Sequence, residues 1–158
     1  MKPMMIKRIL VATDFSDCSR DALDYALGLA ERLGAEVHLV HVFERPVYFE
    51  VGVSHSLQLG HNVDEWIRDL KAGATKQFDA LAAEVRGRQP GTQASLREGV
   101  PVDEILKAAK ETSADLIVLG THGRTGLPHV VLGSVAERVV RSAACPVLTV
   151  RPAAGARP

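Results

Sequence analysis

The chain has 158 residues, 46% of them hydrophobic, which is typical of one globular domain with an ordinary apolar core. Lys plus Arg and Asp plus Glu each number 19, and aromatic residues make up only 4%. This balance argues against a nucleic-acid-binding protein, which would carry a basic excess and aromatic side chains that stack on bases. No apolar run approaches the ~20 residues of a membrane span. We therefore expect a cytoplasmic protein that binds neither nucleic acid nor membrane.

The first part of the chain alternates between strand and helix patterns. Ile6–Ala12 is a predicted strand, followed by a polar turn in which either Ser16 or Ser19 caps the next helix. Apolar residues at three- and four-residue steps predict that helix over Asp17–Leu33. A second strand is predicted over Glu36–Phe43.

The middle of the chain is harder to interpret. Pro46–Asn62 has no steady apolar period, and a mobile flap and a contact with a partner remain equally open for it. A helical period returns over Asp64–Arg86 and is expected to end at the Gly87–Gly91 break. Gln93–Glu98 is a polar, alternating segment that predicts a strand at the edge of a sheet.

The last part of the chain repeats the alternation. A helix is predicted over Val102–Glu111, and the apolar run Leu116–Leu119 predicts a buried strand. Ser134 is expected to start a helix, because Ser134 and Glu137 fit a capping box. Pro146–Val150 is the fifth predicted strand. The whole forms one predicted domain over residues 1–151, with a disordered tail over 152–158.

Five strands alternating with four helices predict an α/β fold, an open parallel sheet with helices on both faces. Ligands of such sheets bind beyond the carboxyl ends of the strands, where the strand order reverses. If the order is 3-2-1-4-5, the first and fourth strands are neighbours at that point. Thr13 and Asp14 would then lie beside the segment from Gly120 to Gly123.

This glycine-rich segment predicts an anion site. The start of a helix offers unpaired backbone N–H groups, and Gly120, Gly123 and Gly133 carry no side chains that would cover them. Ser134 adds a hydroxyl donor. The segment is neither a Walker loop nor a dinucleotide fingerprint. The alternative interpretation is that the segment is an ordinary strand-to-helix connection and that its glycines serve only the turns.

Four short motifs resemble those of the universal stress protein family, and the resemblance extends from Ile6 to Arg151. The nucleotide-binding branch of that family carries the pattern G-x2-G-x9-G-[ST]. In this chain the motif residues are Gly120, Gly123, Gly133 and Ser134; Ala12-Thr13-Asp14; His41-Val42; and Gly99-Val100-Pro101.

The resemblance implies an ATP site, or one for AMP or ADP, at the reversal point of a 3-2-1-4-5 sheet. It implies that Asp14 accepts hydrogen bonds from the ribose and that the backbone of Val42 contacts adenine. The turn from Gly120 to Gly123 and the segment Gly133-Ser134-Val135 would surround the phosphates. Arg124 would offset phosphate charge, with Mg²⁺ assisting. Similar proteins form homodimers through the last strand, here Pro146–Val150.

Three functions stay open at this point: an ATP-binding regulator of the stress response, a slow ATPase or self-phosphorylating protein, and a nucleotide-free interaction module. His122 either touches phosphate or fills the turn. Asp14 has a simpler alternative as a helix cap, and Arg124 as a solvated loop charge. Trp66, with its neighbours on the helix, is expected to serve helix packing.

Overall fold

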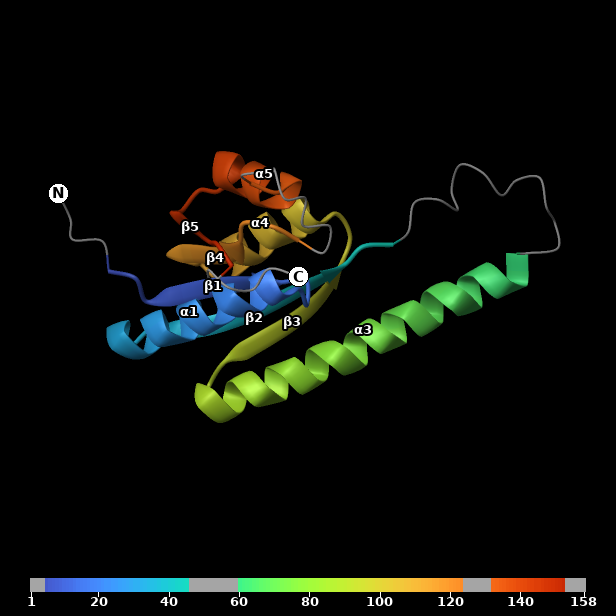
Figure 1. Ribbon diagram of the computed structural model, residues 1–158, viewed down its shortest axis with the longest axis horizontal. Helices are drawn as coiled ribbons and strands as arrows, with labels where there is room; N and C mark the ends of the chain where they lie inside the picture. The colour runs from blue at the N-terminus through green and yellow to red at the C-terminus, as the bar shows by residue number, and fades with distance from the viewer. Residues whose placement is uncertain (1–4, 46–59, 124–131, 153–158) are drawn as a thin grey trace.

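The computed structural model describes residues 5–45, 60–123 and 132–152 (Figure 1). Strands and helices alternate along these residues. In chain order they are β1 (Arg8–Thr13), α1 (Asp17–Leu33), β2 (Glu36–Phe43), α3 (Gly60–Arg88), β3 (Gln93–Glu98), α4 (Pro101–Glu111), β4 (Leu116–Gly120), α5 (Ser134–Ser142) and β5 (Val147–Val150).

The five strands form one parallel sheet in the order β3-β2-β1-β4-β5, which confirms the predicted fold. β1 lies at the centre, where Ile9 pairs with Val37 of β2 and with Leu116 of β4. β1 and β4 consist mainly of buried apolar residues, as expected for strands covered on both faces. β2 and β3 are added on one side of β1, and β4 and β5 are added on the other. The strand order therefore reverses between β1 and β4, which is where this architecture places ligands.

Helices cover both faces of the sheet. α1 and the C-terminal half of α3 pack on one face, and α4 and α5 pack on the other. Two separate apolar clusters result, because alternate residues of each strand point to opposite faces. On β1, Ile9 and Val11 belong to the α1 cluster and Leu10 belongs to the α4 cluster. Figure 1 shows the N-terminal half of α3 extending away from the sheet.

β1 begins two residues later than the sequence predicts, and a carboxylate marks its start. Asp115 Oδ2 accepts the backbone N–H groups of Lys7 and Arg8, both at 2.9 Å. These bonds join the start of β1 to the residue that precedes β4, so the two central strands are aligned from their first residues.

The bounds Asp64–Arg86 expected for the second predicted helix were wrong at both ends. α3 starts at Gly60, inside the segment with no apolar period, and continues through Gly87 to Arg88. A single helical glycine costs only about 1 kcal/mol relative to alanine, and Val85, which is fully buried, holds this end of the helix on the sheet. The turn comes later, at Gly91, where φ is +87°. Residues 46–59 and 153–158 lie outside the described residues, and so do the expectations that fall on them.

None of the helices in the described ranges combines the length and apolar character needed to cross a bilayer.

Candidate functional site

The turn after β1 is built from hydrogen bonds between neighbouring residues. Asp14 Oδ1 accepts the Ser16 backbone N–H at 3.0 Å and the Ser16 hydroxyl at 2.5 Å. Ser16 Oγ in turn accepts the Ser19 N–H at 3.2 Å, so Ser16 is the N-cap of α1. Thr13 Oγ1 accepts the Phe15 N–H at 3.1 Å. The carboxylate of Asp14 therefore orders the turn before α1, but the simpler alternative, in which Asp14 itself caps that helix, was wrong because the N-cap is Ser16.

Phe15 adopts a left-handed backbone conformation, with φ at +66°. Such a conformation costs a residue with a side chain roughly 1–2 kcal/mol, and strain of this kind is common at ligand sites. The Phe15 ring packs against His41 of β2, with ring centroids 4.2 Å apart. This contact holds the turn in its strained form at the end of the strand.

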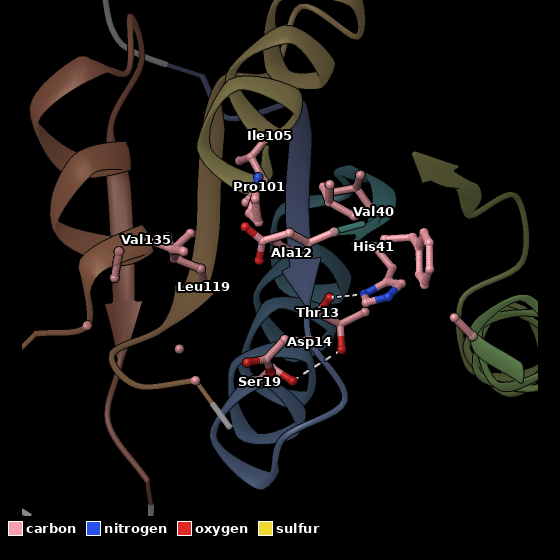
Figure 2. A pocket seen from close by; sticks show the side chains of 18 of the residues that line it. Ala12, Thr13, Asp14, Ser19, Val40, His41, Pro101, Ile105, Leu119 and Val135 are labelled. Atoms are coloured by element: carbon pink, nitrogen blue, oxygen red, sulfur yellow. Dashed lines mark hydrogen bonds between the residues drawn. The ribbon is translucent and has the colours of Figure 1, made fainter. Parts of the chain in front are cut away.

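His41 fixes the neighbouring carbonyl. Its Nδ1 lies 2.7 Å from the Thr13 carbonyl oxygen, and because a carbonyl only accepts, Nδ1 carries the proton. The side chain is buried, with 5% exposure. Figure 2 shows this hydrogen bond beside the one between Thr13 and Ser19.

The turn after β4 runs directly against the start of α5. The Gly133 N–H donates to the Thr121 carbonyl at 2.6 Å, and the Thr121 N–H donates to Val150 of β5 at 2.9 Å. A methyl group on Gly133 would lie 3.1 Å from the Thr121 oxygen and 3.6 Å from the Cα of His122. Glycine at 133 is therefore what allows the helix start to approach the strand end this closely.

The capping box predicted at Ser134 and Glu137 was wrong, although α5 does begin at Ser134. The N-cap is Gly133, so Ser134 is the first helical residue, and Glu137 forms an ion pair with Arg141 at 2.9 Å. A glycine N-cap has no side chain that could cover the N–H groups of the first turn. This arrangement favours an anion at the helix start more than a serine cap would.

The two turns meet. A methyl group built on Gly123 would lie 2.9 Å from Asp14 Oδ2, so the loop after β4 reaches the carboxylate after β1. Gly120 has a different neighbour: a methyl group there would lie 2.8 Å from Cys18 Sγ and 3.0 Å from the Cys18 backbone. Gly120 is thus required by the packing of β4 on α1.

A cavity of about 1020 Å³ opens at this point, at the upper end of the range for small-molecule sites (Figure 2). Ten of the predicted site residues line it: Ala12, Thr13, Asp14, Val42, Gly120, His122, Gly123, Gly133, Ser134 and Val135. Arg124 lies outside the described residues. His122 lines the cavity and also pairs its Nδ1 with Thr121 Oγ1 at 2.9 Å, so both of its expected roles have a basis.

One wall of this cavity was not predicted from the sequence. Trp66, Leu70 and Gly73 of α3 line it, together with Asp69, Ala74 and Gln77. Trp66, which was expected to serve helix packing, lines the cavity and keeps 43% of its surface exposed. The sequence held one signal of this wall. Phe78 is packed in the core, and the apolar period of α3 continues from it toward the N-terminus of the helix.

The described residues hold no ready-made metal centre. Within residues 5–45, 60–123 and 132–152, no three His, Cys, Asp or Glu side chains are grouped so that they could hold a metal ion. What the cavity offers instead is the carboxylate of Asp14 at the two turns, with Glu44 and Asp69 elsewhere in the lining, the backbone N–H groups around two glycines, and an apolar remainder that includes Val40, Val42 and Leu119.

The family model described as the Universal stress protein family matches residues 5–151. The chain belongs to the universal stress protein family. A universal stress protein of Methanocaldococcus jannaschii is 37% identical over 147 residues, which are 93% of this chain and 83% of that protein. The structure of universal stress protein UspA from Lactobacillus plantarum has a TM-score of 0.75 at 27% identity, covering 92% of this chain and 98% of that one.

A universal stress protein solved in complex with cAMP also shares the fold. Its TM-score is 0.61 at 24% identity, over 94% of this chain and 98% of that one. At this identity the likeness concerns the fold alone.

Proposed function

We propose that this universal stress protein is a cytoplasmic regulator of the stress response that binds ATP, or AMP or ADP, and acts as a nucleotide-dependent homodimer. The observation that carries the proposal is the approach of Gly123 to Asp14, at the mouth of a cavity large enough for a nucleotide. A carboxylate, which accepts from hydroxyl groups, and a helix start, which attracts anions, are then separate parts of one site.

The roles proposed for the residues follow from their chemistry. Asp14 accepts hydrogen bonds from the ribose hydroxyls, since its carboxylate lines the cavity beside Gly123. The backbone N–H groups around Gly123, Gly133 and Ser134 donate to the phosphates, because α5 presents its N-terminus there. The backbone of Val42 contacts the adenine edge.

We expect Mg²⁺ to arrive with the nucleotide. Magnesium in nucleotide sites is bound mainly by substrate phosphates and water, with one or two protein carboxylates. Arg124 is proposed as the cation that offsets the remaining phosphate charge. The dimer is proposed to form along the open edge of β5, in the segment Pro146–Val150.

The first experiment identifies the ligand directly. The purified protein is denatured, and the released small molecules are analysed by mass spectrometry; an adenine nucleotide is expected. ATP with Mg²⁺ at a hundred times its Kd should stabilise the fold by ~2.7 kcal/mol. For a chain of this size that raises Tm by several degrees. No retained nucleotide and no shift in Tm would contradict nucleotide binding and favour the interaction module.

Gly123→Val tests the site itself. The new side chain would meet the Asp14 carboxylate and cover the neighbouring N–H groups, so we expect at least a tenfold loss of ATP affinity in calorimetry, with the far-UV circular dichroism unchanged. Gly87→Val is the matched control, because a side chain there meets nothing within 4 Å. Equal ATP affinities in the two variants would show that the phosphates bind elsewhere.

A further inference from the structure

The two halves of α3 have different surroundings. Phe78, Ala82 and Val85 in the C-terminal half are buried in the core. In the N-terminal half, Trp66 and Leu70 keep 43% and 39% of their surface exposed. These two large apolar side chains are one helical turn apart, so they share a face of the helix.

Ion pairs hold this N-terminal half near the carboxyl ends of the strands. Lys71 Nζ lies 2.6 Å from Glu98 Oε2, at the last residue of β3, and this hydrogen bond lowers the pKa of Glu98. Arg45 Nη2, two residues after β2, lies 3.8 Å from Asp64 Oδ1. The helix is therefore attached on the side of the sheet where the cavity opens.

The exposed apolar face looks into that cavity. Trp66, Leu70 and Ala74 follow one another at four-residue steps, and all three line it. Gly73, on the same wall, adds no side chain that would fill the space. Val42 and Gly133 line the same cavity, so one continuous space joins the phosphate-binding end to the α3 wall.

We propose that Trp66 stacks on the base of the bound nucleotide and that Leu70 supports the stack. This inference rests on the proposed function. With the phosphates at Gly123 and Gly133, the base of the same ligand is directed to the other end of the cavity, where Val42 is proposed to contact it. An indole face that is half exposed there gains a planar partner, and base–aromatic stacking is a strong, sequence-tolerant contribution to nucleotide binding.

A stacking role makes three variants informative. Trp66→Ala should weaken ATP binding about tenfold in calorimetry, in line with the effect of removing one stacking side chain. Trp66→Phe, which keeps an aromatic face, should stay within about threefold of the parent protein. Tyr25→Ala is the matched control, since Tyr25 is an exposed aromatic residue on α1 that does not line the cavity. We expect it to leave ATP affinity unchanged.

Stability and fluorescence separate stacking from a structural role. Because Trp66 is 43% exposed and Phe78 is buried, replacing Trp66 by alanine should lower the urea midpoint much less than replacing Phe78 does. Trp66 is the only tryptophan of the chain, so ATP should change its emission and protect it from acrylamide quenching.

The outcomes distinguish the two proposals. ATP binding in which Trp66→Ala behaves like the parent, or in which the emission of Trp66 does not change, overturns the stacking role and leaves the proposed function standing. Loss of affinity accompanied by an equal loss of stability also overturns it. If the parent protein binds no adenine nucleotide in calorimetry, both proposals fall.

Discussion

Single residues decide how closely the two central strands and their helices approach. Gly120 and Gly123 belong to one sequence motif, yet a side chain on each would meet different atoms. At Gly120 the obstacle is Cys18, including its backbone, and at Gly123 it is the end of the Asp14 carboxylate. The motif therefore combines one position that serves packing with one that opens the site, and the spacing pattern alone does not separate them.

Gly120→Ala should destabilise the protein by about 1–3 kcal/mol, because an added methyl group has to displace the start of α1. Urea unfolding followed by circular dichroism measures this change. Gly28→Ala is the control: a methyl group there meets only Arg32 at 3.6 Å, an ordinary contact, and alanine favours the helix by up to about 1 kcal/mol. If both variants unfold at the same urea concentration, β4 and α1 are less tightly packed than the distances indicate.

His38 on β2 makes the stability depend on pH. Its Nε2 lies 3.0 Å from Ser95 Oγ, and burial lowers the pKa of His38 below its ordinary value of 6.5. Below pH 6.5, His38 is therefore protonated in the unfolded chain, whereas in the folded protein it is protonated only at a lower pH. The free energy of unfolding should fall as the pH drops from about 7 toward 5.

His38→Gln should make this fall less steep, since glutamine does not titrate. Urea midpoints measured at half-unit pH steps give the two slopes. Equal slopes would mean that groups other than His38 account for the acid sensitivity.

At the scale of elements, α3 is one helix with two kinds of support. Its C-terminal half is held by buried apolar contacts with the sheet, whereas its N-terminal half is attached by the exposed pairs Lys71–Glu98 and Arg45–Asp64. Exposed ion pairs contribute between about 0 and 1 kcal/mol each. The N-terminal half should consequently open more often than the rest of the helix.

Hydrogen exchange tests this difference. Amides around Trp66 to Gly73 should exchange far faster than those around Phe78 to Val85, and ATP should slow the first group while leaving the second unchanged. Mass spectrometry of peptides from the two halves measures both effects. Uniform protection along α3 in the absence of nucleotide would contradict the difference in support.

At the scale of the whole molecule, the repeating apolar pattern was enough to predict the sheet. Buried parallel strands such as Leu116–Gly120 are continuous apolar runs, and the polar Gln93–Glu98 lies at the edge as predicted. The order of the strands came from the family resemblance and not from the apolar pattern. The end of α3 was not predictable in this way, because the burial of Val85 outweighs the local preference of Gly87. The α3 wall was missed because an apolar helical period does not reveal whether its face meets a core or a cavity.

The open edge of β5 is where the proposed dimer can be tested. The carbonyl oxygens of Pro146 and Val150 accept hydrogen bonds from the N–H groups of Ile117 and Thr121 on the β4 side. Because backbone groups alternate in direction along a strand, the N–H and carbonyl of Thr149 face the open edge. Thr149→Pro removes an outward N–H and should convert a dimer into a monomer in light scattering, with the circular dichroism preserved. A parent protein that is monomeric, or a variant that remains dimeric, would contradict assembly through this edge.

The neighbours Asp14 and Gly123 come from opposite ends of the sequence, and this has a consequence for biosynthesis. A ribosome-bound chain that has already completed β1, β2 and β3 still lacks the half of the cleft that is proposed to receive the phosphates. If the proposed site is the nucleotide site, nucleotide would neither nucleate nor guide early folding of the nascent polypeptide. It would bind only after β4 and the start of α5 have been synthesised.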